Sequence, residues 1–150
     1  MNYFYLKKSF DNIKKMDYMT KPVAFLDTTD FDNNGIISNP NIPSDVMPVF
    51  IMIQANFCFH CKNAKPAYQQ FADNFEGRIF CASIQGDSPN PNVKDIFRSG
   101  KIHKICPEFV GYPSYVVQYR GSIIQYNGGR RQEDLENYAR QLLDFISKNT

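Results

Sequence analysis

A run of five apolar residues, from Val49 to Ile53, stands shortly before two cysteines with two residues between them, Cys58-Phe59-His60-Cys61. Such a run is typical of a strand that is buried on both faces in the middle of a sheet. Apolar side chains then recur at helical spacing over residues 59–75, where Pro66 removes one hydrogen bond and bends the helix. The sequence therefore predicts a buried strand, a cysteine pair at a helix N-terminus, and a kinked helix.

The remaining chain alternates between strand and helix patterns. Strands are expected at 23–26, 78–84, 114–119 and 122–126, and helices at 92–97, 102–106 and 132–147. Arg120-Gly121 joins the last two strands into a hairpin. The final helix places its apolar residues on one face, so that it can pack on the sheet: Leu135, Tyr138, Leu142, Phe145 and Ile146.

Length and composition narrow the class of protein. With 150 residues, 43% of them hydrophobic, the chain can form one domain around a single core. Its 13 Phe and 9 Tyr exclude a disordered chain, and a net charge of +2 gives no reason to expect a nucleic-acid partner. The apolar run is too short to cross a membrane, and no signal peptide is visible at the N-terminus. We therefore expect no transmembrane span and a reducing compartment.

The first 22 residues form an amphipathic pattern. Leu6, Phe10 and Ile13 share one helical face, and lysines occupy the rest. Such a helix can lie on a membrane or a partner, but a solvated surface helix is the commoner outcome. We expect an N-terminal helical extension over 1–22 and the main domain over 23–150.

Residues 30–37 partly match a calcium-binding EF-hand loop. Acids occupy the first and third positions and Gly35 the sixth, but the twelfth position, which should supply a carboxylate, is Asn41. Asn34-Gly35 is a favourable turn, because both residues tolerate positive φ. A turn is the better interpretation.

The cysteine pair carries the chemistry. Backbone N–H groups and the helix dipole stabilise an anion at a helix N-terminus, so Cys58 is the expected nucleophile. Cys61, one turn further on, can close a disulfide onto it. His60 would stabilise the reduced form and so make the disulfide a stronger oxidant. The sequence predicts a reversible redox pair without a metal or an organic cofactor.

The alternative for this pair is half of a structural zinc site, which requires four ligands. Cys81, Cys106 and His103 are the other candidates besides His60, but they form no second close-spaced pair. Cys81 is expected to be a buried packing residue, and Cys106 to be exposed beside Pro107. A disulfide between Cys81 and Cys106 remains open at this point.

Taken together, these residues resemble the thioredoxin superfamily, and the cysteine pair is most similar to that of protein disulfide isomerase domains. The resemblance extends from residue 23 to 146 and includes the buried strand, Cys-Phe-His-Cys-Lys, Pro66, Gly111-Tyr112-Pro113 and Gly121. It implies an α/β thioredoxin fold, in which a central mixed β-sheet is flanked by helices on both faces.

The resemblance also implies roles for several residues. Pro113 would follow a cis peptide bond and pack against the disulfide, and the Tyr112 backbone would receive an extended substrate. Tyr112 itself either packs within its loop or lines the substrate groove together with Phe57 and Phe59. Phe57 stands where the family usually has Trp, and Phe59 stands where isomerase domains have Gly. Met52 replaces an acid that the family often buries.

The function implied is that of a protein thiol–disulfide oxidoreductase, with a mixed-disulfide intermediate and a more oxidising pair than a typical thioredoxin. Its partners would be protein thiols and disulfides and a redox partner that the sequence does not identify. Compact proteins of large DNA viruses combine an isomerase-like site with the absence of a signal peptide, so the expected location is the cytoplasm or a virion. The alternative is a binding or assembly module with little turnover, which would contact a partner through Phe57, Phe59 and the N-terminal helix.

Overall fold

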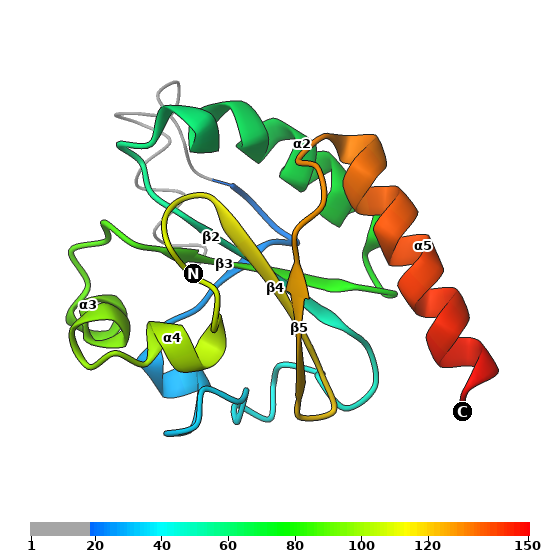
Figure 1. Cartoon of the computed structure of the whole chain (residues 1–150), viewed down its shortest axis with the longest axis horizontal. Coiled ribbons are helices and arrows are strands. Elements are labelled where there is room, and N and C mark those ends of the chain that lie inside the picture. Colours follow the sequence, from blue (N-terminus) through cyan, green and yellow to red (C-terminus); the bar gives the residue numbers. More distant parts are fainter. Residues whose placement is uncertain (1–18) are drawn as a thin grey trace.

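The computed structural model describes residues 19–150; residues 1–18 of the predicted N-terminal helix lie outside this range, and residues 19–22 are not helical. Five strands form one sheet (Figure 1): β1 (Ala24–Phe25), β2 (Val49–Gln54), β3 (Phe80–Gln85), β4 (Ser114–Tyr119) and β5 (Ser122–Tyr126). The helical elements are η2 (Thr28–Asp30), α2 (Phe59–Phe75), α3 (Pro91–Arg98), α4 (Ile102–Ile105) and α5 (Gln132–Lys148).

The sheet is mixed, in the order β1-β3-β2-β4-β5. β3 runs parallel to both β1 and β2, whereas β4 is antiparallel to β2 and to β5. The apolar run in β2 is thus flanked on both sides, and all six of its residues are buried. The prediction of a central buried strand is confirmed.

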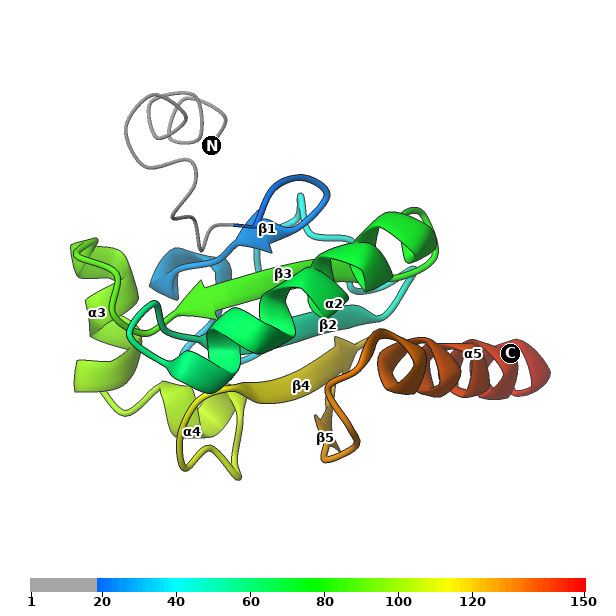
Figure 2. The same ribbon diagram turned by 90° about the horizontal axis from the view of Figure 1, so that it is seen from above.

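Helices cover both faces of the sheet. α2 and α5 lie on one face, and α3 and α4 lie on the other (Figures 1 and 2). Alternate residues of β2 face the two layers: Phe50 and Met52 belong to the core under α2 and α5, and Ile51 and Ile53 to the core under α3 and α4. The α/β thioredoxin fold with helices on both faces is therefore observed as predicted.

The segment that partly matched a calcium loop is a turn. Gly35 has φ of +79°, and a Cβ atom at this position would collide with the backbone of Lys104. The Asp32 carboxylate accepts hydrogen bonds from the amides of Asn34 and Ile36 at 2.8 and 3.0 Å. The carboxylate that would have served as a calcium ligand therefore stabilises the turn instead.

The C-terminal helix differs from the prediction at one residue. Leu135 is fully buried, and Tyr138 and Leu142 pack against the core, but Phe145 is 64% exposed. The end of α5 extends past the sheet (Figures 1 and 2), so within residues 19–150 the Phe145 side chain is left largely uncovered. Placing Phe145 on the packed face was wrong.

The two cysteines outside the pair are both buried and free. The expectation that Cys106 is exposed was wrong, because it packs in the core under α3 and α4 with no exposed surface. Cys81 is buried as predicted, but in the core on the opposite face of the sheet. A disulfide between them would have to cross the sheet, so the fold excludes this pairing.

Candidate redox site

Cys58 occupies the junction between the central strand and the first long helix. β2 ends at Gln54, and Cys58 is the N-cap of α2, with its sulfur accepting a hydrogen bond from the Cys61 amide at 3.2 Å. The side chain of Cys58 is partly exposed. The sulfur therefore lies at the positive end of the helix dipole and is accessible to a substrate.

Cys61 lies one turn into α2 and is fully buried. Burial, followed by the hydrogen bond and charge of Cys58, raises the pKa of the Cys61 thiol to about 12, while the Ala55 backbone and the Lys65 charge oppose this increase. Cys61 is thus a protonated thiol at neutral pH. The two sulfurs of one pair have different environments.

The loop before β4 completes the surroundings of the pair. The Tyr112–Pro113 peptide bond is cis, as the resemblance implies, and Pro113 is buried. The Cys58 thiol donates a weak hydrogen bond to the Tyr112 carbonyl at 3.7 Å. Residues 54 positions apart in the sequence therefore meet at the reactive sulfur.

Aromatic side chains gather around this contact. The ring of Tyr112 packs edge-on against Phe57 at 5.8 Å and against Phe109 at 5.4 Å. Its hydroxyl lies against Gly86, where a Cβ atom would overlap it. Tyr112 thus fills its own loop and also lies beside the partly exposed Cys58 sulfur, so both of the predicted roles for this residue are compatible with its position.

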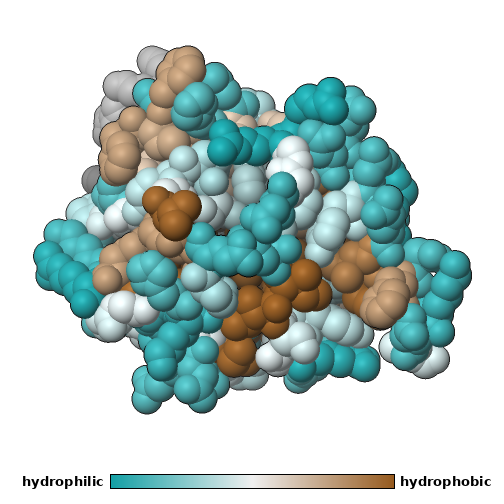
Figure 3. Space-filling model, viewed as in Figure 1, coloured by the Kyte–Doolittle hydropathy of each residue, from teal (hydrophilic) through white to brown (hydrophobic). Residues whose placement is uncertain are grey.

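Three exposed apolar side chains belong to the two segments that meet at the Cys58 sulfur, and we call them the apolar rim: Phe57 (72% exposed), Phe59 (69%) and Val110 (97%). Figure 3 shows apolar side chains near the start of α2 and near the loop before β4, and a second apolar patch over β5. Val110 was not predicted, because a single valine in a loop carries no periodic signal. Exposed apolar groups beside a reactive sulfur can contact an unfolded or extended protein segment.

Asp87, which no sequence pattern singles out, holds the segment before Cys58. Its carboxylate accepts hydrogen bonds from the amides of Asn56 at 3.0 Å and Phe57 at 3.3 Å. The Gln85 side chain donates to the same carboxylate at 3.1 Å. The loop between β3 and α3 therefore anchors the backbone that carries the cysteine pair.

Lys65 was also missed, because a lysine in an amphipathic helix is usually solvated. It is only 5% exposed, and its ammonium group donates to the Asn56 side chain at 3.0 Å. It follows Cys61 by one helical turn, so its positive charge lies on the same side of α2 as the buried sulfur.

His60 projects from the first turn of α2 and is exposed, as the sequence predicted. Its ring contacts Phe59 edge-on at 5.8 Å. It also lines a pocket of about 320 Å³ together with Arg130 and Arg131. The imidazole is therefore exposed to solvent on the first turn of α2, between the two cysteines in the sequence.

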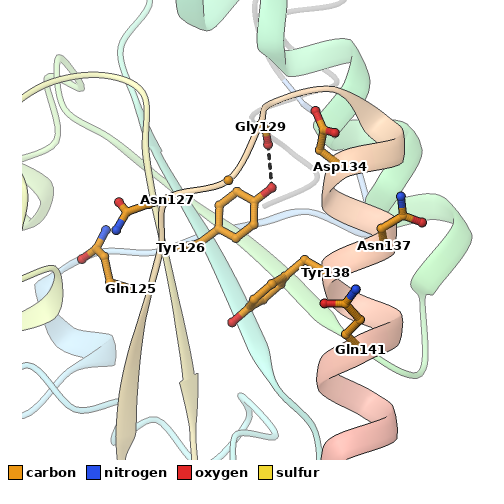
Figure 4. Close-up of a pocket in the computed structure, with 9 residues that line it drawn as sticks. Gln125, Tyr126, Asn127, Gly129, Asp134, Asn137, Tyr138 and Gln141 are labelled. Carbon is orange, nitrogen blue, oxygen red and sulfur yellow. Dashed lines mark hydrogen bonds between the residues drawn. The ribbon is translucent and has the colours of Figure 1, made fainter.

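A second pocket, of about 460 Å³, lies between the end of β5 and α5 (Figure 4). The Tyr126 hydroxyl donates to the Gly129 carbonyl at 2.6 Å in its wall, and Asp134, Asn137 and Gln141 project from α5. These side chains are polar and include no sulfur, so the pocket is separate in chemistry from the redox pair.

Residues 19–150 contain neither a cluster of metal-binding side chains nor a membrane-spanning helix. No three His, Cys, Asp or Glu side chains in this range are grouped so that they could hold a metal ion. No helix in the same range is long and apolar enough to cross a membrane.

Comparison with known sequences finds a viral relative. The chain is 35% identical over 135 residues to thioredoxin-like protein 453L of Invertebrate iridescent virus 6. The alignment covers 81% of this chain and 95% of that protein. The chain is also 25% identical over 116 residues to human protein disulfide-isomerase A4, covering 74% of this chain and 17% of that protein. No family model matches the sequence.

Comparison with solved structures agrees with the fold. The first thioredoxin domain of mouse protein disulfide-isomerase A4 has a TM-score of 0.56 and 23% identity, covering 84% of this chain and 79% of that one. Chloroplastic thioredoxin z also has a TM-score of 0.56, with 17% identity, covering 85% of this chain and 99% of that one. With the fold, the Cys-x-x-Cys pair and the viral relative in agreement, the chain belongs to the thioredoxin superfamily.

Proposed function

We propose that the protein is a thiol–disulfide oxidoreductase that acts on protein substrates. The Cys58 thiolate attacks a substrate disulfide and forms a mixed disulfide, and one substrate sulfur leaves as a thiolate. Cys61 then attacks the Cys58 sulfur, forms the Cys58–Cys61 disulfide and releases the second substrate thiol. The pair loses two electrons and the substrate gains them, and oxidation of a substrate follows the same steps in reverse.

The difference between the two sulfurs is the observation that supports this proposal. Cys58 is partly exposed at the N-terminus of α2, where a thiolate is stabilised, and Cys61 is fully buried with a raised pKa. One sulfur is thus suited to meeting a substrate, and the other to reacting only with its neighbour.

The apolar rim and the Tyr112 carbonyl indicate the substrate class. Phe57, Phe59 and Val110 offer exposed apolar surface, and the Tyr112 backbone lies 3.7 Å from the Cys58 sulfur. An extended protein segment with apolar side chains could contact both. We therefore propose unfolded or partly folded proteins as substrates, with a separate redox partner that regenerates the pair.

We further propose a more oxidising pair than that of a typical thioredoxin. His60 is exposed to solvent on the first turn of α2. A positive charge there would favour the thiolate form of Cys58 over the disulfide.

Similarity to the iridescent virus protein supports a viral origin, and with it a location in the cytoplasm or a virion.

Two assays on the wild type and Cys58→Ser test the function: reduction of insulin, and reoxidation of a reduced unfolded protein. The wild type should accelerate at least one of them, and Cys58→Ser should accelerate neither. Equal rates for the two proteins in both assays would exclude the enzyme and favour a binding module that uses the apolar rim.

A further inference from the structure

The resolving step of the proposed function requires a group that stabilises a negative charge on a buried sulfur. Cys61 is fully buried, and its thiol must lose a proton before the sulfur can attack Cys58. Desolvation opposes this ionisation, and the Ala55 backbone and the Lys65 charge offset it only in part. Met52, on the central strand, is apolar and cannot serve. A further hydrogen-bond donor is therefore required for the resolving step, a requirement that rests on the proposed function.

Tyr115 lies on the same face of the sheet as the cysteine helix. It is the second residue after Pro113, it pairs with Met52 across β2 and β4, and it is only 3% exposed. Its ring packs against Tyr68 of α2 at 6.1 Å, and Tyr68 follows Cys61 by seven residues, on the same side of that helix. Tyr115 thus lies under the stripe of α2 to which Cys61 belongs.

The hydroxyl of Tyr115 differs from those of its neighbours. The Tyr68 hydroxyl lies 2.8 Å from the carbonyl oxygens of both Phe50 and Ala82, and the Tyr126 hydroxyl donates to Gly129. Within residues 19–150, the Tyr115 hydroxyl is buried and has no hydrogen-bond partner. An unpaired buried hydroxyl is costly and therefore unusual, so this donor is available for a charge that exists only during the reaction.

The charged groups that affect Tyr115 are those expected for a side chain under the cysteine helix. Burial raises the pKa of Tyr115 above its ordinary range, negative charge on Cys61 and Cys58 raises it further, and the Arg130 guanidinium opposes the increase. The titratable or charged groups that face Tyr115 or Cys61 come from the cysteine helix and its N-cap, from the loop before β4, from β5 and from the loop before α5: Cys58, Lys65, Tyr68, Tyr112, Tyr126 and Arg130. A tyrosine in these surroundings keeps its proton, so its hydroxyl can donate a hydrogen bond to a thiolate.

We propose that the Tyr115 hydroxyl donates a hydrogen bond to the Cys61 thiolate while that sulfur attacks the mixed disulfide. The bond between Cys61 and Cys58 forms, and the bond between Cys58 and the substrate sulfur breaks. The proton released by Cys61 ends on the departing substrate thiolate, or in solvent when that thiolate is as weakly basic as nitrothiobenzoate. Tyr115 keeps its own proton, so protons and electrons balance without another reactant.

Single-turnover kinetics with the aromatic disulfide dithiobis(nitrobenzoate) separate the two steps. Attack by Cys58 releases the first coloured nitrothiobenzoate ion, and attack by Cys61 releases the second. In Tyr115→Phe the first release should keep its wild-type rate, whereas the second should be about tenfold slower. The pH midpoint of the rate of the second release should rise by about one unit, as expected for the loss of one hydrogen bond to a charged sulfur.

Tyr126→Phe is the matched control, because Tyr126 pairs with Tyr115 across the hairpin but its hydroxyl donates to Gly129. It should leave both releases unchanged. The thermal midpoint of Tyr115→Phe should be equal to that of the wild type or higher, because only an unpartnered hydroxyl is removed.

The outcomes are distinguishable. A second release with wild-type rate and pH midpoint in Tyr115→Phe overturns the proposal, and so does equal slowing of both releases, which would indicate a structural role. If Cys58→Ser releases the coloured ion as fast as the wild type does, the proposed function itself fails, together with the resolving step.

Discussion

The backbone amide of Cys61 donates a hydrogen bond to the sulfur of Cys58 at 3.2 Å. The residue that would resolve the mixed disulfide therefore also stabilises the attacking sulfur, through its backbone rather than its side chain. Because Cys58 is the N-cap of α2, this contact depends on the helix starting at Phe59. The reactivity of one cysteine and the burial of the other thus follow from the same helix N-terminus.

The buried Cys61 thiol predicts lower stability at alkaline pH. Burial raises its folded-state pKa from 9.0 to about 12, so its contribution is complete below about pH 9 and is lost as pH rises toward 12. Between about pH 7 and about pH 10, the reduced wild type should lose on the order of 1 kcal/mol more stability than reduced Cys61→Ala. Urea unfolding with a reductant present measures this difference. An equal loss in both proteins would show that ionisation of Cys61 does not cause the loss of stability at alkaline pH.

Removal of the Asp87 carboxylate should loosen the segment that carries the cysteine pair. Asp87→Ala leaves the amides of Asn56 and Phe57 without this acceptor, so we expect a loss of about 1 kcal/mol in the free energy of unfolding. Turnover of a protein disulfide should fall as well. Asp87→Asn keeps one acceptor oxygen and should recover part of both effects.

Asp45→Ala is the control for this change, because Asp45 is an exposed acid shortly before the start of β2, at the end opposite the cysteine pair. It should leave turnover at the wild-type value. If Asp87→Ala and Asp45→Ala behave alike, the anchoring role of Asp87 is wrong.

The predictions from sequence succeeded where the signal was local. The hairpin has its predicted limits, Ser114–Tyr119 and Ser122–Tyr126, because alternating residues surround a turn in which Arg120 and Gly121 both have positive φ. The predicted burial of Phe145 was wrong because periodicity defines one face of a helix but not the point at which the helix leaves the sheet. The predicted exposure of Cys106 was wrong because the sequence does not show which part of the chain covers it.

The same distinction applies to the site. Cys58 and Cys61 could be found because their spacing within one helical turn is itself the signal. Asp87 contacts the backbone 31 and 30 residues away, and Tyr115 comes to lie on the face of the sheet under the cysteine helix through strand pairing between β2 and β4. Contacts of this kind arise from topology, so a single sequence contains no pattern that reveals them.

The apolar rim should matter for protein substrates but not for small ones. Phe59→Ala removes a ring that is 69% exposed beside Cys58, so KM for an unfolded protein disulfide should rise several-fold, equivalent to about 1 kcal/mol. The rate with a small aromatic disulfide should be unchanged. Phe145→Ala, which removes an exposed ring from the far end of α5, should change neither value. An equal change in KM for the two variants would show that the apolar rim does not contribute to substrate binding.

His60 should shift the reduction potential. If its imidazole favours the reduced pair, His60→Ala should lower the potential by about 20 mV, equivalent to about 1 kcal/mol. Equilibration with glutathione buffers measures the potential. His103 is the matched control, because it is exposed and contacts Phe109 rather than the cysteine helix. A potential that is unchanged, or higher, in His60→Ala would refute the oxidising role.

The division of labour between the two sulfurs is tested most directly by trapping the mixed disulfide. Cys61→Ser lacks the resolving sulfur, so after incubation with an unfolded disulfide-containing protein it should remain linked to that protein through Cys58, and intact-mass measurement should show the sum of the two masses. Cys58→Ser should show no adduct, because Cys61 is fully buried. An adduct on Cys58→Ser equal to that on Cys61→Ser, or none on Cys61→Ser, would contradict the assignment of Cys58 as the attacking residue.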